Sequence, residues 1–283
     1  MIGSCGGVGD YQGAKGIGLV TVDVKDHLVD VYTTHVVAGY SLVDEYKAHR
    51  VTNMMEIVDF VRAHSSSELS IVTGDMNNPP DECEVRYLLN QLQLRDTVEE
   101  SRSDLILPTH FFSPVRLDYI LYQAPRRPWT LKDSFVCYHK GDLETERSGP
   151  PTAAPVFYSD HQGVYAEFTL REEPSDQEFA VTKSEPASSF IPPCESLLAS
   201  EIKLSEQRQR FHLFTSGVLL CSGAASAAAS YYLCQSPMMM GVGAAGAGIL
   251  ALSSMATFYY RSIKKGEQVF VENQLTNLQA QER

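Results

Sequence analysis

Two long stretches without a formally charged residue, 211–233 and 238–260, constrain this chain more than any other feature. Each is about as long as the ~20 residues that a helix needs to cross a ~30 Å hydrocarbon core. Only residues 234–237 separate them, so they predict a transmembrane helical hairpin. Small residues four apart, such as Gly223 with Ala227 and Gly243 with Ala247, are typical of membrane helices that pack closely. The alternative is a helical pair buried in a soluble core, which is disfavoured because no other segment is left to cover it.

Basic residues flank the hairpin on both sides. They are Lys203, Arg208 and Arg210 before it, and Arg261, Lys264 and Lys265 after it. Positive flanks favour the cytosolic side of a membrane. We therefore expect a multi-pass integral membrane protein with both termini and the N-terminal domain in the cytosol. The hairpin length and its small residues favour a thin internal membrane such as the endoplasmic reticulum.

The first 171 residues have the hydrophobic periodicity of a mixed α+β domain. β-rich runs predict an antiparallel strand pair at 15–24 and 28–35 and further strands at 115–122, 131–138 and 163–170. A short apolar run predicts a buried strand at 69–73 that breaks at Gly74 into a polar loop. Apolar residues at spacings of three and four predict an amphipathic helix over 43–63, and a short helix is expected over 84–92. The domain organisation that follows is a catalytic domain at 1–171, a polar linker at 172–205, the hairpin at 206–265 and a cytosolic tail at 266–283.

The charge balance restricts the class of ligand. The chain has 23 Lys and Arg against 35 Asp and Glu, a formal charge of -12, and no basic stripe. Nucleic-acid binding draws on basic surface, so a nucleic acid is not the expected partner. The six cysteines show neither metal-ligand spacing nor a compact disulfide pattern, which favours a reducing compartment. No secretory signal pattern is found in the first residues.

Four polar clusters follow or begin predicted strands. They are Thr34-His35, Gly74-Asp75-Met76-Asn77, Arg116-Leu117-Asp118-Tyr119 and Tyr158-Ser159-Asp160-His161. Any one of them is compatible with an ordinary turn, because Asp and Asn often bond their own backbone there. Ligands of layered α/β folds usually bind at the rim of the sheet, so four such clusters together predict an active site.

These clusters carry a family resemblance. The set T-H-x-x-A at 34–38, G-D-x-N at 74–77, L-D-Y at 117–119 and S-D-H at 159–161 resembles the endonuclease/exonuclease/phosphatase superfamily. That superfamily consists of metal-dependent phosphodiesterases with a DNase-I-like, four-layer α/β sandwich. Together with the terminal hairpin, the segment from Thr34 to Tyr40 and the Ala48-His49-Arg50-Val51 segment resemble the type 1 neutral sphingomyelinases. The resemblance covers residues 15–265.

Phosphodiester hydrolysis needs an activated water, a clamp on the phosphate oxygens and help for the leaving group. His161 is the expected general base, because imidazole titrates near neutrality. Asp118 would orient it, as the resemblance also implies. The remaining candidates are Asp75 and Asn77 to align the water and hold the phosphate, His35 to bond a phosphate oxygen or assist the leaving group, Asp160 as a metal ligand, and Lys15 as a phosphate contact or equally a solvated lysine. His49, His64, His110 and His139 match no catalytic motif and are assigned structural roles.

The resemblance implies a Mg²⁺ cofactor whose principal ligands are an Asn on the first strand and a Glu on a following one. Both lie N-terminal to the segment that matches here. In this chain the matching segment already begins at residue 15. We therefore expect a fragment, a shortened isoform or a protein that has lost its metal. Losing ~3–5 kcal/mol of metal stabilisation means a roughly hundred- to several-thousand-fold slower reaction, so the chain as written is expected to be weakly active or inactive.

The leading hypothesis is a Mg²⁺-dependent phosphodiesterase of phospholipase C type that converts sphingomyelin into ceramide and phosphocholine. Lyso-phosphocholine lipids are the other substrate class, and the oligomeric state is open. Two alternatives are an inactive membrane scaffold of the same fold and an inositol-phosphate phosphatase of the same superfamily, for which more Lys and Arg near the motifs are expected. A soluble nuclease conflicts with the hairpin and the acidity.

Overall fold

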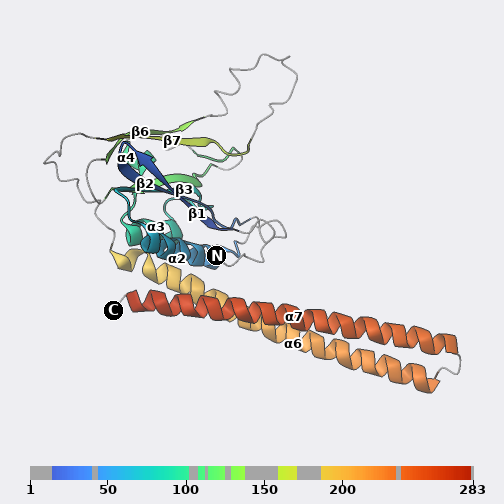
Figure 1. Ribbon diagram of the computed structural model, residues 1–283. Coiled ribbons are helices and arrows are strands. Elements are labelled where there is room, and N and C mark those ends of the chain that lie inside the picture. Colours follow the sequence, from blue (N-terminus) through green and yellow to red (C-terminus); the bar gives the residue numbers. More distant parts are fainter. Residues whose placement is uncertain are drawn as a thin grey trace, which may run out of the picture. The chain divides into compact units, whose positions relative to one another are not determined.

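The computed structural model of the 283-residue chain describes residues 15–39, 44–101, 108–111, 114–124, 129–137, 159–170, 186–233 and 237–281 (Figure 1). They belong to two compact units, Met1–Cys194 and Glu195–Arg283.

The first unit is built on a five-stranded sheet with the strand order β1-β2-β3-β5-β4. Strands β1 (Ile17–Val24) and β2 (His27–His35) form an antiparallel hairpin. Lys25 and Asp26 make its two-residue turn with φ of 54° and 67°. Positive φ at both turn positions matches the right-handed twist of the strands. The antiparallel pair predicted from the sequence is confirmed.

Helix α2 (Lys47–His64) connects β2 to β3 (Leu69–Asp75), which pair in parallel. Strand β5 (Asp118–Gln123) lies antiparallel on the other side of β3 and also pairs with the short β4 (Arg95–Asp96). Helix α3 (Cys83–Leu92) packs beside α2, and α4 (Thr97–Glu100) follows β4. The predicted strand–helix–strand unit and the short helix are therefore present, although the longer helix begins at Lys47 rather than at residue 43, which lies outside the described residues.

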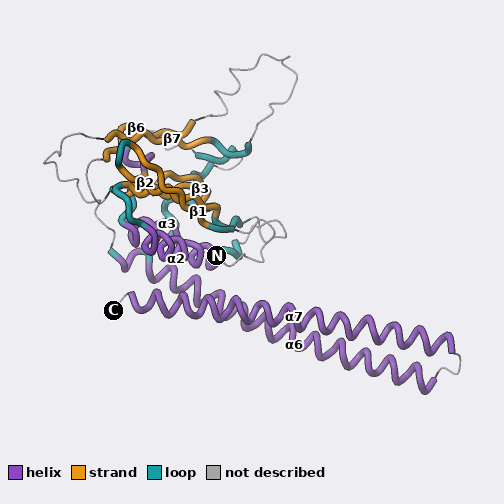
Figure 2. Tube along the Cα trace, viewed as in Figure 1, coloured by secondary structure: helices purple, strands orange, loops and turns teal. Residues whose placement is uncertain are grey.

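The two faces of the sheet have different partners (Figure 2). On one face, Val29, Leu69 and Tyr122 form a core cluster with Trp129 of a second sheet. That sheet pairs β6 (Trp129–Cys137) with β7 (Gly163–Leu170). On the opposite face, Tyr32 meets Phe60 of α2 edge to face, with ring centroids 6.2 Å apart. Side chains alternate between the two faces along β2, so one side of the strand faces the second sheet and the other faces α2. The mixed α+β class predicted from the sequence is confirmed.

The second unit consists of two long helices, α6 (Ile191–Leu233, which starts in the first unit) and α7 (Pro237–Gln281). They run antiparallel, since Ser254 Oγ donates to Ser216 O at 3.0 Å and the rings of His212 and Tyr260 lie 4.8 Å apart. A Cβ on Gly223 would lie 3.4 Å from Ala247 O. The predicted close approach at this small residue is therefore present.

Helix α6 begins earlier than the sequence predicted. A 3₁₀ turn, Ala187–Ser189, precedes it, and the helix starts at Ile191, so residues 191–205 of the expected linker are helical. Pro192 and Pro193 suggested a linker, but a helix tolerates proline in its first turn, where the N–H groups have no intrahelical partner. Residues 171–185 lie outside the described residues. Helix α7 continues to Gln281, so residues 266–281 of the expected tail are helical as well.

One helix in the described part of the chain is long and apolar enough to cross a membrane. It is assigned to Ile191–Ala229, with a mean hydropathy of 1.3 in its most apolar window, of which 11% is buried. The two-span hairpin and the domain boundaries remain predictions.

Candidate active site

Three of the sequence candidates stand side by side across the central sheet. The register pairs His35 of β2 with Asp75 of β3, and Asp75 with Asp118 of β5. Residues paired in register share a face, and His35 has the same parity as Val29, whose side chain faces the β6–β7 sheet. The three polar side chains therefore line one end of the face between the two sheets.

The loop after β3 is held by its backbone. Gly74 has φ of 140°, and a Cβ there would lie 1.9 Å from Thr34 O, so no side chain fits. Asn77 follows in the left-handed region with φ of 51°. Its N–H donates to Asp75 Oδ1 at 2.8 Å, and its side-chain Nδ2 donates to Val36 O at 2.8 Å. These bonds orient both Asp75 and Asn77.

His161 joins His35, Asp75 and Asp118 from a different segment of the chain. An isolated antiparallel bridge joins His110 to His161, with Gln162 N–H donating to Thr109 O at 2.7 Å and Phe111 N–H donating to Asp160 O at 2.9 Å. Thr109 Oγ1 also accepts from Asp118 N–H at 3.0 Å. The short segment around Thr109 thus holds the start of β5 and the His161 loop together.

The ring of His161 has a defined orientation. Its Nδ1 lies 2.7 Å from Asp118 Oδ2, the distance of a charge-assisted hydrogen bond. Its Nε2 lies 3.9 Å from Asp75 Oδ2, too far for a direct bond. On the other side of Asp75, His35 Nε2 is 3.4 Å from the same Oδ2, and its side chain is 55% exposed. An oriented imidazole, two carboxylates and an accessible second imidazole can move a proton to or from a bound ligand.

The carboxylates also shift the acidities in the site. Burial lowers the pKa of His161, but the bond from Asp118 and the charges of Asp118, Asp75 and Asp160 outweigh it and raise that pKa above its usual 6.5. Burial raises the pKa of Asp75 above 3.8, and the charge of Asp118 adds to the increase, while the Asn77 bond and the two histidines oppose it. Such perturbed groups gathered at one rim are typical of functional sites.

His110 is a site neighbour that the sequence reasoning assigned to structure. Its ring centroid is 5.0 Å from that of His161 in an edge arrangement, and its Nε2 is 3.8 Å from Asp160 Oδ2. Its role could not be predicted from the motifs, because Thr109-His110 belongs to none of the four polar clusters. Its position depends on the backbone bridge to His161, for which the sequence carries no local signal.

Two groups in the described residues have donor atoms close enough to hold a metal ion. One consists of Asp75, Asp118 and His161, and the other of His110, Asp160 and His161. Mg²⁺ prefers oxygen ligands, so the first group, with two carboxylates, fits it better than the second, with one carboxylate and two imidazoles.

The structure thus brings His35, Asp75, Asn77, Asp118 and His161 together and places Asp160 beside His110. Lys15 lies two residues before β1, next to Gly16, whose carbonyl accepts from Thr34 Oγ1 at 2.9 Å. Tyr158 and His139 lie outside the described residues.

Known proteins resemble the chain in sequence, although no protein-family model matches it. Over 189 residues, which are 60% of this chain and 42% of the relative, it is 26% identical to sphingomyelin phosphodiesterase 2 of Homo sapiens. Over 190 residues, 60% of this chain and 43% of the relative, it is 27% identical to the Mus musculus protein of the same name. The chain is similar to the sphingomyelin phosphodiesterases.

The resemblance to the neutral sphingomyelinases expected from the motifs is thereby confirmed. The chain spans less than half the length of these curated relatives. Among solved structures, a crystal structure of beta toxin from Staphylococcus aureus is 20% identical, with 56% of this chain and 59% of that chain covered and a TM-score of 0.39.

Proposed function

We propose that the chain is a phosphodiesterase of the neutral sphingomyelinase type, which hydrolyses sphingomyelin to ceramide and phosphocholine. The observation that carries the proposal is the Asp118–His161 pair, 2.7 Å between Oδ2 and Nδ1, with Nε2 of the same ring turned toward Asp75. Sequence similarity to sphingomyelin phosphodiesterases supports the choice of substrate class.

His161 acts as the general base. Asp118 holds the Nδ1 proton, so Nε2 is the nitrogen that accepts a proton from water. The 3.9 Å between Nε2 and Asp75 Oδ2 leaves room for one water that would bond both atoms, since two hydrogen bonds of about 2.8 Å can reach across it. The water oxygen attacks phosphorus, its proton passes to Nε2, and the bond from phosphorus to the ceramide oxygen breaks.

The other residues serve the phosphate and the leaving group. His35, exposed and 3.4 Å from Asp75, donates to a phosphate oxygen or protonates the ceramide alkoxide. Asn77 is anchored through Nδ2 to Val36 O and presents the rest of its amide to the water and the phosphate. Lys15 contributes a positive charge near the end of β2. A positioned general base of this kind contributes about 10²–10⁴-fold in rate.

Mg²⁺ is the proposed cofactor. Asp75 and Asp118 would hold it through carboxylate oxygens, whereas Asp160, the ligand predicted from the sequence, lies in the other group with His110 and His161. When bound, it would polarise the phosphoryl oxygens and offset their charge.

The finer architecture belongs to the same proposal. We infer a DNase-I-like four-layer sandwich for the first unit and a transmembrane hairpin for the second, with the catalytic domain and both termini in the cytosol at an internal membrane such as the endoplasmic reticulum. The helix and sheet layers on opposite faces of the central sheet support the former. The charge-free stretches support the latter, and tethering would keep the site at high concentration over its lipid substrate.

The test is phosphocholine release by the purified full chain from mixed micelles of sphingomyelin or lysophosphatidylcholine, with Mg²⁺ or with a chelator. We expect weak Mg²⁺-dependent release, which His161→Ala should reduce at least a hundredfold and His64→Ala should leave unchanged, because His64 lies at the exposed end of α2. No release by the folded wild-type chain from either lipid would refute the enzymatic proposal and favour the membrane scaffold. Release from inositol phosphates alone would favour the phosphatase.

A further inference from the structure

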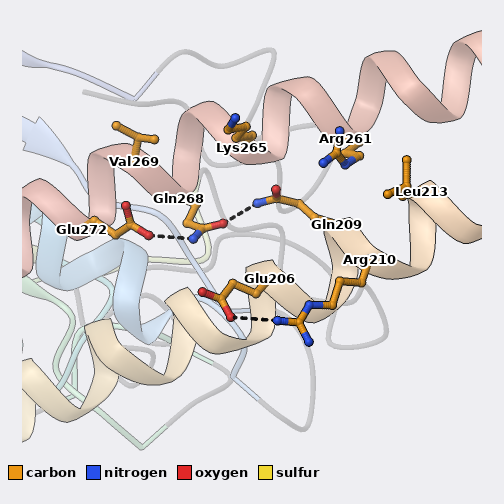
Figure 3. A pocket seen from close by; sticks show the side chains of 9 residues that line it. All are labelled: Glu206, Gln209, Arg210, Leu213, Arg261, Lys265, Gln268, Val269 and Glu272. Carbon is orange, nitrogen blue, oxygen red and sulfur yellow. Dashed lines mark hydrogen bonds and ion pairs between the residues drawn. The ribbon is translucent and has the colours of Figure 1, made fainter.

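A polar groove lies between the two long helices of the second unit (Figure 3). Its volume is about 320 Å³. Side chains of both helices line it, among them Arg210 and Leu213 of α6 and Arg261, Lys265 and Val269 of α7. The groove therefore depends on the antiparallel pairing of the two helices.

The groove is found where the apolar part of the helix pair ends. Arg210 is the last charged residue before the charge-free stretch, and Arg261 is the first after it. The pairing of His212 with Tyr260, 4.8 Å between ring centroids, brings these two ends level. Once the apolar parts are inserted in a bilayer, the groove therefore lies at the level of the lipid phosphates.

The groove holds three cationic and two acidic side chains, and each acidic one has a neighbour within the groove. Glu206 Oε2 lies 3.9 Å from Arg210, and Glu272 Oε1 accepts from Gln268 Nε2 at 2.6 Å. In contrast, Arg261 Nε is buried and has no hydrogen-bond partner among the residues that the structure describes. Lys265 forms no ion pair with any residue that the structure describes. A buried guanidinium nitrogen without an acceptor is costly, and an anionic ligand would supply that acceptor.

The side chains that line the groove suit a phosphate group that is attached to an apolar molecule. A guanidinium and an ammonium group one helical turn apart, Arg261 and Lys265, match the non-bridging oxygens of a phosphate. Leu213 and Val269 add apolar surface to the same groove. We propose that this groove binds the phosphate group of an anionic membrane phospholipid, a site separate from the candidate active site. The proposal rests on the membrane insertion of the helix pair proposed above.

The experiment measures binding of short-chain phosphatidic acid, phosphatidylcholine and inorganic phosphate to the full chain in neutral detergent by titration calorimetry. We expect phosphatidic acid to bind at least tenfold more tightly than phosphatidylcholine. The double variant Arg261→Gln, Lys265→Gln should weaken that binding at least tenfold. The matched control, Lys203→Gln with Arg208→Gln, removes two charges from α6 outside the groove and should stay within twofold of wild type.

Any of the following three results would overturn the inference. Equal affinity for the two lipids means that the groove does not select an anion. Equal losses in the variant and the control mean that only the total charge matters. Inorganic phosphate that binds as tightly as the lipid means that a soluble phosphate is the ligand. Flotation of the wild-type chain with phosphatidylcholine vesicles is measured separately, and its failure would refute membrane insertion rather than the selectivity of the groove.

Discussion

Replacing Gly74 by alanine should both destabilise the first unit and disturb the candidate active site. Gly74 lies in β3 directly before Asp75, with φ of 140°, a conformation that L residues rarely adopt. The register places it opposite Thr34, and the added Cβ would lie 1.9 Å from Thr34 O. Because that atom is backbone, relief requires β2 and β3 to separate where His35 and Asp75 stand side by side.

The magnitude has two parts. Backbone strain of this kind costs about 1–3 kcal/mol. Forced overlap in a packed interior costs typically about 1–3 kcal/mol more. The free energy of unfolding should therefore fall by about 2–6 kcal/mol, a large part of the roughly 5–15 kcal/mol of an ordinary domain. With a urea m-value of about 2 kcal/mol/M, the unfolding midpoint should move down by roughly 1–3 M.

The assay is urea unfolding followed by tryptophan fluorescence. The chain has a single tryptophan, Trp129, which is 5% exposed in the core between the sheets and reports on the first unit. Gly18→Ala is the matched control, because a Cβ there would meet Thr33 Cγ2 at an ordinary 3.6 Å and Gly18 has no positive φ. We expect the control to change the midpoint by less than about 0.5 M. The same small shift for Gly74→Ala would falsify the reasoning about this glycine.

Three further predictions concern charge. Asp118→Asn removes the charged partner of His161 Nδ1 and should lower phosphocholine release about 10²–10⁴-fold, measured at saturating sphingomyelin. Because the carboxylates raise the pKa of His161 above 6.5 and a base must be neutral, wild-type release should increase with pH through an apparent pKa above 6.5; a pH–rate profile measures it. Arg116→Ala should cost about 3–5 kcal/mol in urea unfolding, because it leaves the buried Asp96 carboxylate, 2.7 Å away, without its partner.

The controls follow from the same contacts. In Asp118→Asn the pH profile should also move to lower pH, since burial, which lowers the His161 pKa, is then less strongly opposed; an unchanged profile would contradict the assignment of His161 as base. Lys132→Ala breaks an exposed ion pair of the same 2.7 Å length, Lys132–Glu167, and should shift the unfolding midpoint far less than Arg116→Ala, because solvent screens the exposed pair. Equal costs for Lys132→Ala and Arg116→Ala would mean that burial of the pair is irrelevant.

Much of the fold is legible in the sequence because it depends on local periodicity. A β-rich run at 28–35 predicted β2, a short apolar run at 69–73 predicted β3, which extends to Asp75, and spacings of three and four predicted α2. The start of α6 could not be predicted from the sequence. Pro192 and Pro193 suggested a loop, but a helix tolerates proline in its first turn. The helical continuation of α7 past residue 265 was missed for a related reason, since polar residues there suggested a solvated tail.

The sequence by itself determined which residue types stand at the strand ends and which stretches carry no charge. The residues at the strand ends predicted phosphodiester chemistry through the family resemblance that they carry, and the charge-free stretches predicted a helix pair, because both depend on residue identity and short spacing. Only the tertiary structure decided which side chains meet: the register that aligns His35, Asp75 and Asp118, the bridge that brings His110 to His161, and the pairing that brings Arg210 level with Arg261. These contacts join residues far apart in the chain, and strand register and helix pairing are set by packing over whole elements rather than by any local pattern.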